Sequence, residues 1–269
     1  PKAFINFIWS NSNMIFHLHQ PRSAFLVTLI SLILPKKFNR VITVHNNFDK
    51  FKKIIQWVII FNIIFAKKAT FVSKSSIDSF PKIFRNIFRN KCSAVTNGVD
   101  LTRVDNYLNE KSLEKTNNSI IKLVYIGKLH IQKNHDKILK ILSKLPKNYK
   151  LTIIGEGAER DKLEKLIKKL DITDRVDITG IIEREMVYEI LLESDIFVST
   201  ALWEGMPIGV LESMACYLPV VLSNIPPHVE IQNNSSTKII FEKAQEFIEK
   251  IKEYGNLDCK ERMLLGLKS

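Results

Sequence analysis

Short apolar runs alternate with longer amphipathic stretches along the whole 269-residue chain. Apolar runs of about four to eight residues between turn residues are typical of buried strands, and apolar positions three and four apart indicate helices. The pattern predicts strands at residues 14–19, 40–45, 69–74, 92–97, 121–127, 149–155, 175–180, 195–200, 218–223 and 237–241. It predicts helices at residues 23–34, 52–68, 136–145 and 159–170. Such alternation indicates an α/β fold with parallel βαβ units.

A polar stretch without apolar period, residues 104–119, interrupts this alternation and predicts a linker. The alternation restarts behind it, so we expect two doubly wound domains, residues 1–112 and 113–269. The chain is long enough for a core in each. It begins at Pro1, with neither Met nor a signal pattern, and we expect that the amino-terminal part of the first domain is missing.

Composition places the protein among soluble globular chains, with 45% apolar and 25% charged residues. The apolar stretches 23–34 and 52–68 fall short of the roughly 20 residues that span a bilayer, so we expect helices packed on a sheet. Cys92, Cys216 and Cys259 are scattered and form no Cys-x-x-Cys pair. They indicate a reducing compartment and argue against a structural metal.

The net charge of +12 is unevenly distributed. Of 40 Lys and Arg and 28 Asp and Glu, residues 1–119 hold 18 and 6, which leaves 22 of each for the rest. A one-sided basic field indicates an anionic partner, such as a membrane surface, a nucleic acid or a phosphorylated substrate. The alternative is that Lys-rich helices only solvate the surface.

Three turn segments in the second half follow predicted strands, where open α/β sheets bind their ligands. They are residues 127–134, 155–157 and 201–209. The segments offer two lysines, glycine-containing loops and a helix start with Pro207 at a first helical position. This set suits a diphosphate. Glu204 and Glu212 stand on either side of the Gly-Met-Pro corner.

These segments resemble glycosyltransferase family 4, whose members are retaining enzymes of the GT-B fold with two Rossmann-like domains facing a cleft. The motif Glu204-Gly205-Met206-Pro207, followed by Glu212 after seven intervening residues, carries the resemblance. Further matches are Gly127-Lys128-Leu129 with Lys133-Asn134, "VTNGVD" at 95–100, and "FHLHQP" at 16–21 with "VITVHN" at 41–46. The resemblance covers residues 13 to about 250.

The resemblance implies a role for each matching residue. Lys128 and Lys133, beside Gly127, would hold the donor diphosphate, and Glu212 would accept hydrogen bonds from the nucleotide ribose. Glu204 would face the transferred sugar, together with the backbone of Gly205, Met206 and Pro207. His45 would reach from the first domain toward the reacting centre, so the catalytic candidates are His45, Glu204, Lys128 and Lys133. Glu230 matches a recurrent glutamate of less defined role.

Each assignment has a structural alternative. In this alternative the two glutamates and the two lysines are solvated surface charges. His45 is then a structural histidine at a strand end whose hydrogen bonds are made within the protein. His17 and His19 lie on one strand face, and we expect at least one of them to be structural.

The chain departs from the family pattern at several positions. An early glycine-rich loop of the first domain is absent, and the last helix looks shortened. Lys128 replaces an arginine and loses its bidentate fork. Tyr217 replaces a glycine, which is unfavourable if the preceding helix ends in a left-handed residue.

We therefore expect a retaining hexosyltransferase that uses a UDP- or GDP-linked sugar. The chain contains no Asp-x-Asp, so we expect lysines and helix amides, and no metal ion, to stabilise the leaving phosphate.

The expected acceptor is a glycan or lipid-linked oligosaccharide in bacterial surface polysaccharide or lipopolysaccharide synthesis, with no nucleic acid partner. We expect a cytoplasmic protein and leave peripheral attachment to an anionic inner membrane face open. The alternatives are a GT-B nucleotide-sugar epimerase and an inactive truncated remnant that binds nucleotide or membrane. The sugar, the base and the oligomeric state stay open.

Overall fold

The computed structural model describes residues 14–34, 38–102, 119–237 and 239–268, together with residues 6, 7, 10 and 104. Contacts within the chain divide it into two compact units, Pro1–Asn97 and Gly98–Ser269. The predicted boundary between residues 112 and 113 lies outside the described residues, as does almost all of the predicted linker.

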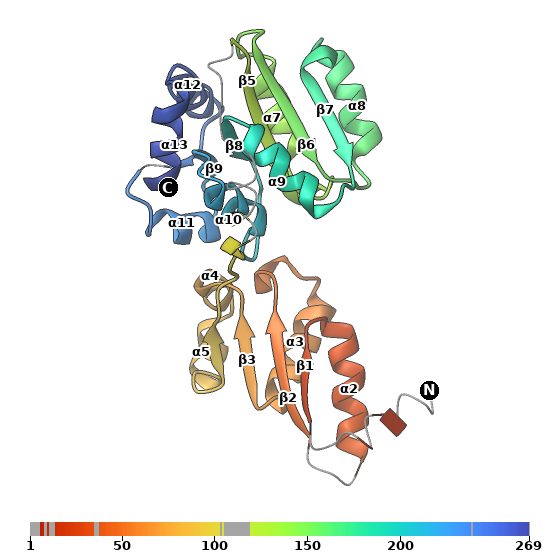
Figure 1. Ribbon diagram of the computed structural model, residues 1–269. Helices are drawn as coiled ribbons and strands as arrows, with labels where there is room; N and C mark the ends of the chain where they lie inside the picture. The colour runs from red at the N-terminus through yellow and green to blue at the C-terminus, as the bar shows by residue number, and fades with distance from the viewer. Residues whose placement is uncertain are drawn as a thin grey trace. The chain divides into compact units, whose positions relative to one another are not determined.

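The first unit is built on a parallel sheet in which the strands follow one another in chain order (Figure 1). Its strands are β1 (Ile15–Leu18), β2 (Asn39–Val44), β3 (Lys68–Phe71) and β4 (Cys92–Ala94). Its helices are α2 (Pro21–Ile33), α3 (Lys53–Phe65), α4 (Lys74–Asp78) and α5 (Lys82–Ile87), with a 3-10 turn η1 (Phe48–Lys50). The strands predicted at 14–19, 40–45, 69–74 and 92–97 are confirmed. All four end sooner than predicted, and β2 and β3 begin one residue earlier.

The two apolar stretches of this unit form α2 and α3, which pack against each other and the sheet. Buried polar side chains inside them are paired: Thr28 Oγ1 donates to Asn62 Oδ1 over 3.1 Å, and Asn62 Nδ2 donates to the Pro21 carbonyl over 3.0 Å. This pairing lets an asparagine sit in an apolar helix without an unsatisfied group. Among the described residues, no helix combines the length and apolar character needed to cross a membrane.

The second unit contains a six-stranded parallel sheet of order β10-β9-β8-β5-β6-β7. Its strands are β5 (Ile121–Ile126), β6 (Tyr149–Ile154), β7 (Val176–Gly180), β8 (Ile196–Ser199), β9 (Val220–Ser223) and β10 (Ile240–Phe241). Chain order runs outward from β5 to β7, then returns to the other side of β5 at β8 and runs outward again. The sheet is thus doubly wound, with its switch point between β5 and β8.

Alternation along each strand divides the apolar side chains between two cores. In β5, Leu123 and Tyr125 enter one core, and Val124 enters the other. The helices of the first core are α7 (His135–Leu142), α8 (Arg160–Lys169) and α12 (Ala244–Gly255). Those of the second are α9 (Arg184–Glu193), α10 (Ile208–Ala215) and α11 (Pro226–Gln232). Full burial of each such side chain contributes about 1.5–3 kcal/mol, so both faces stabilise the sheet.

Two details of the second unit bear on the predictions. Pro207 is the residue before α10 and not its first helical residue, so the helix begins one position later than predicted. Tyr217, behind the helix end, has a φ of 58°, which is the left-handed conformation that glycine favours. The chain ends in two helices, α12 and α13 (Cys259–Lys268).

Candidate functional site

The topology of the second unit indicates where a ligand binds. In doubly wound sheets the loops behind the carboxyl ends of the two central strands diverge at the switch point and leave room for a ligand. Here those loops are residues 127–134 behind β5 and 200–207 behind β8. They are two of the three turn segments that the sequence singles out.

Close backbone contacts hold the loop behind β5 against residues 155–157, the turn behind β6. A Cβ at Gly155 would lie 2.2 Å from the Gly127 carbonyl oxygen, and one at Gly157 would lie 2.3 Å from that of Leu129. Gly155 also has a φ of 151°. These positions therefore require glycine, because any side chain would push the two loops apart.

We expect Gly157→Ala to lower the free energy of unfolding by about 1–3 kcal/mol, as overpacking does, because its methyl group meets backbone that has no rotamer to yield. The matched control is Gly98→Ala, since a Cβ at Gly98 meets nothing within 4 Å. Urea unfolding of both variants measures the difference. Equal stabilities would show that the loops are not in contact as described.

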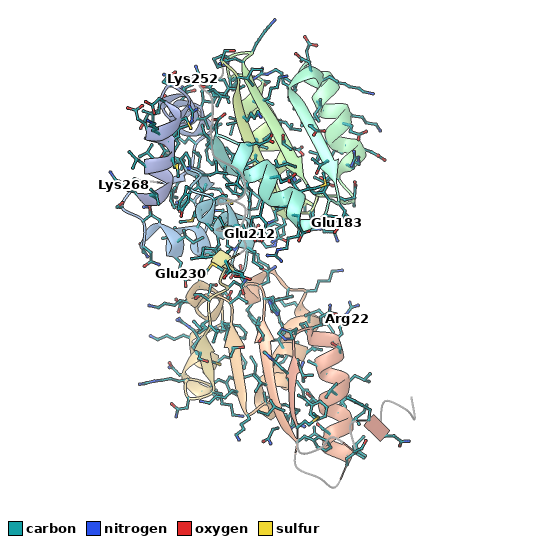
Figure 2. The ribbon with its side chains drawn as sticks, in the orientation of Figure 1. Arg22, Glu183, Glu212, Glu230, Lys252 and Lys268 are labelled. Carbon is teal, nitrogen blue, oxygen red and sulfur yellow. The ribbon has the colours of Figure 1, made fainter. Side chains whose placement is uncertain are left out.

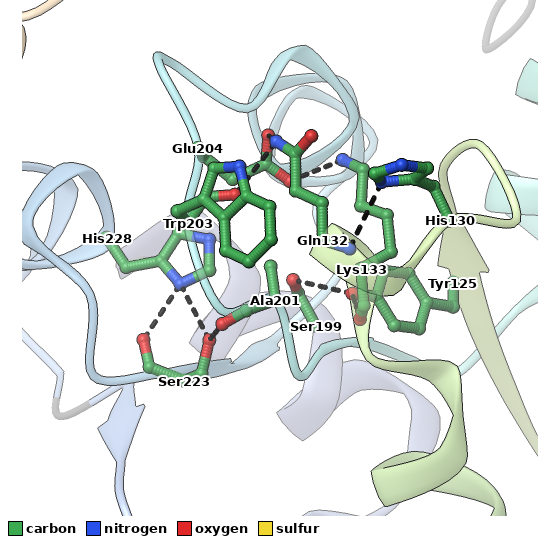
Figure 3. A network of polar contacts seen from close by, with 10 residues as sticks. All are labelled: Tyr125, His130, Gln132, Lys133, Ser199, Ala201, Trp203, Glu204, Ser223 and His228. Atoms are coloured by element: carbon green, nitrogen blue, oxygen red, sulfur yellow. Dashed lines mark hydrogen bonds and ion pairs between the residues drawn. The ribbon is translucent and has the colours of Figure 1, made fainter. Parts of the chain in front are cut away.

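The two loops meet in a polar network around Glu204 (Figure 3). The Lys133 ammonium forms an ion pair with Glu204 Oε1, and Gln132 Nε2 donates to Oε2 over 3.2 Å and to the Trp203 carbonyl over 2.8 Å. Only 19% of the Lys133 side chain and 9% of the Glu204 side chain are exposed. Both carboxylate oxygens of Glu204 are thus engaged by side chains of the protein.

Buried groups beneath the network fix its geometry. Tyr125 donates its hydroxyl to the Lys133 carbonyl over 2.5 Å, and Ser199 donates to the Tyr125 hydroxyl over 3.3 Å. Thr200 Oγ1 donates to the carbonyl of Asn134, which itself adopts a φ of 51° ahead of α7. Burial raises the pKa of Tyr125, so the phenol keeps its proton and stays a donor.

The remaining predicted donor-site residues lie around these loops. Lys128 is exposed, and among the described residues its ammonium has no hydrogen bond or ion pair. Gly205 and Pro207 are buried and Met206 partly so, directly ahead of α10. The first backbone N–H groups of a helix lack intrahelical partners, so the start of α10 offers donors to an anion.

Glu212 lies on α10 (Figure 2). Its carboxylate forms an ion pair with Arg184 of helix α9. Arg184 Nη2 donates to Glu212 Oε1 over 2.7 Å, and the Tyr188 hydroxyl lies 3.4 Å from the same oxygen. Only 10% of the Glu212 side chain is exposed. Burial raises the pKa of Glu212, and the Arg184 charge opposes that shift.

Two buried histidines flank the network in the uncharged form. His228 and His135 each have a pKa lowered to about 4, mainly by burial and further by the charge of Lys133. His228 Nδ1 lies 2.8 Å from the Ser223 carbonyl, so Nδ1 carries the proton. His135 packs against Tyr125 with 4.6 Å between ring centroids. Neither adds positive charge to the site at neutral pH.

The predicted residue of the first unit, His45, lies behind the carboxyl end of β2. Its Nε2 is 2.9 Å from His19 Nδ1, and His17 Nε2 is 2.7 Å from Thr43 Oγ1. Burial lowers the pKa of His45 first, and the charges of His19 and His17 lower it further. The three histidines form one cluster, and His17 has the satisfied partner expected of a structural residue.

Sequence reasoning missed Gln132, Arg184, Tyr188 and His228. Gln132 lies inside the "GKLHIQKN" segment and could have been found from that position alone, whereas Arg184 and Tyr188 lie in a charged helix start without a recognisable motif. Glu230 is partly exposed on α11 (Figure 2). Within the described part of the chain, no group of three or more His, Cys, Asp or Glu could hold a metal ion.

The sequence profile of one family, glycosyl transferases group 1, matches residues 108–264. A Campylobacter jejuni relative, N-acetylgalactosamine-N,N'-diacetylbacillosaminyl-diphospho-undecaprenol 4-alpha-N-acetylgalactosaminyltransferase, is 28% identical over 152 residues, which are 56% of this chain and 40% of that protein. An Escherichia coli relative, UDP-Gal:alpha-D-GlcNAc-diphosphoundecaprenol alpha-1,3-galactosyltransferase, is 31% identical over 146 residues, or 50% of this chain and 37% of that protein. The match thus spans less than half the length of each of these relatives.

Among solved structures, Anabaena HepE in complex with UDP and glucose matches 99% of this chain and 74% of its own, with a TM-score of 0.82 and 14% identity. This likeness concerns the fold. Together with the two parallel sheets, it confirms the predicted GT-B class of two parallel-sheet α/β domains. The predicted double winding is present in the second sheet, whereas the described strands of the first sheet follow one another in chain order.

Proposed function

We infer that this chain, which belongs to the glycosyl transferases group 1 family, is a retaining hexosyltransferase whose donor is a nucleotide-diphospho sugar. The observation that carries the proposal is the convergence of Lys133, Glu204 and the start of α10 at the switch point of the second sheet. Cations and helix amides at this edge suit a diphosphate. The UDP in the HepE complex supports a uridine donor, with a guanosine donor as the alternative.

The proposed chemistry follows from the charges. When the bond between the anomeric carbon and the diphosphate breaks, negative charge grows on the leaving phosphate, and fixed cations stabilise it. The exposed ammonium of Lys128 is accessible to a phosphate. The charge of Lys133 is paired with Glu204, and a diphosphate would have to displace that carboxylate. A bound diphosphate would draw Lys133 to itself and free Glu204 for a hydroxyl of the transferred sugar. His45 of the first unit is proposed as a further catalytic residue.

We propose that no metal ion takes part, because lysines and amides supply the positive charge and the chain lacks Asp-x-Asp. A panel of UDP- and GDP-sugars tests the donor class by thermal denaturation in the presence of a chelator. We expect donors of one base to raise the melting temperature and donors of the other to have little effect. A folded protein whose melting temperature responds to no member of the panel would contradict the proposal.

The proposed acceptor is a glycan or lipid-linked saccharide in bacterial surface polysaccharide synthesis, used by a cytoplasmic protein at the inner face of the membrane. The undecaprenol-linked acceptors in the names of both relatives support it. The surface of α3 supports it too, because Trp57 is 65% exposed and Lys53 is also exposed on the same helix.

We expect the protein to bind vesicles of anionic phospholipid and to lose that binding as salt rises, because surface charges are screened within about 10 Å at 0.1 M salt. Reversing Lys50, Lys52 and Lys53 to Glu should weaken binding further. Co-sedimentation with anionic and neutral vesicles measures both effects. Vesicle binding that is unchanged by salt and by these reversals would mean that the lysines are only solvated surface residues.

A further inference from the structure

The two oxygens of the Glu212 carboxylate have different surroundings. Oε1 accepts from Arg184 Nη2 over 2.7 Å and faces the Tyr188 hydroxyl at 3.4 Å. For Oε2, no donor is present among the residues that the structure describes, and the atom is not sealed from solvent. A carboxylate has about four acceptor positions, so Oε2 is free to accept from a ligand.

The position of Arg184 accounts for the difference between the two oxygens of Glu212. It is the first residue of α9, and Glu212 lies on α10, so the ion pair joins two helices of the same core. The arginine is 53% exposed, whereas Glu212 is 10% exposed. A surface ion pair contributes little, about 0–1 kcal/mol, but here one partner is a buried carboxylate whose pKa is raised by burial and lowered by the Arg184 charge.

We propose that Arg184 is a positioning residue for the nucleotide ribose: it holds Oε1 of Glu212 so that the ionised Oε2 accepts hydrogen bonds from the ribose hydroxyls of a nucleoside diphosphate. The inference rests on the proposed function, since it assumes a nucleotide donor at this site. Tyr188 assists from the next turn of α9 and contributes a neutral donor to the same oxygen.

Two consequences separate this role from a merely structural one. First, the benefit of Arg184 depends on the ribose hydroxyls, so its removal should affect UDP more than 2′,3′-dideoxy-UDP. Second, Arg184 and Tyr188 are the groups that face Glu212 from α9, and Arg184 is the only charge among them. Without that charge the pKa of Glu212 rises further, so the ionised fraction is smaller at lower pH and increases as pH increases.

The experiment measures the affinities of UDP and 2′,3′-dideoxy-UDP by calorimetry for the unsubstituted protein, Arg184→Met and Arg184→Lys. We expect Arg184→Met to weaken UDP about tenfold at pH 6.5 but to weaken the dideoxy analogue less than twofold. The ratio of variant to unsubstituted affinity for UDP should move toward one by pH 8.5. Arg184→Lys should restore part of the loss, because it keeps the charge without the planar fork.

Arg160→Met is the matched control, since Arg160 also pairs with glutamates, Glu156 and Glu164, but at the surface of α8. It should leave both affinities unchanged. Equal losses of UDP and dideoxy-UDP in Arg184→Met, with no pH dependence, would overturn the inference. If the unsubstituted folded protein bound neither UDP nor GDP, the proposed function itself would fail, which distinguishes the two outcomes.

Discussion

Replacing Glu204 by Gln is expected to lower turnover of the full nucleotide-sugar donor by about 100-fold or more without weakening free nucleotide diphosphate. Glu204 is proposed to contact only the transferred sugar, and a carboxylate at the reacting centre contributes to the transition state more than to the ground state. Free UDP should bind slightly more tightly, because the neutral amide of the variant no longer competes with the diphosphate for the Lys133 ammonium.

A transfer assay and a calorimetric titration on the same preparation separate the two effects. Glu156→Gln serves as the control, because Glu156 lies in the neighbouring turn but pairs with Arg160 at the surface. It should leave both turnover and affinity unchanged. Loss of UDP binding in Glu204→Gln would place the carboxylate at the nucleotide and contradict its assignment to the sugar.

Replacing Glu212 by Ala is expected to weaken free nucleotide diphosphate tenfold or far more. A hydrogen bond to a charged group contributes roughly 1.5–3 kcal/mol, and about 1.4 kcal/mol corresponds to a factor of ten. The open Oε2 is placed to accept at least one such bond from the ribose. A titration of Glu212→Ala against Glu249→Ala, an exposed glutamate of α12, measures the effect. Equal affinities of the two variants for UDP would refute the ribose assignment.

Much of the fold follows from local pattern. The predicted strands from 121–127 to 237–241 all occur. Short runs of branched apolar residues between turns favour buried strands over helices. The adjacency of β5 and β8 could not be predicted, since strand order depends on packing between segments far apart in the chain. The helices α9 and α11 were missed: α9 mixes charged and apolar residues, and α11 begins with two prolines.

The candidate site shows the same limit. The sequence singled out Lys133 and Glu204 as separate motif residues, and the structure brings them into an ion pair across 71 positions. The sequence could not show that Lys133 and Gln132 engage both carboxylate oxygens of Glu204. Nor could it show that only Oε1 of Glu212 accepts hydrogen bonds among the described residues. That difference arises from Gln132 and Arg184, whose sequence surroundings resemble any polar turn and any charged helix start.

The central claim is that the switch-point loops of the second unit hold a nucleotide diphosphate by protein charges. Calorimetric titration of the unsubstituted protein with UDP and GDP in the presence of EDTA tests it most directly, with Lys133→Met as the variant that locates the site. The account predicts saturable binding of one of the two nucleotides in EDTA and a loss of affinity of about tenfold or more in Lys133→Met. Binding that appears only when a divalent metal is added, or that is unchanged in Lys133→Met, would contradict it.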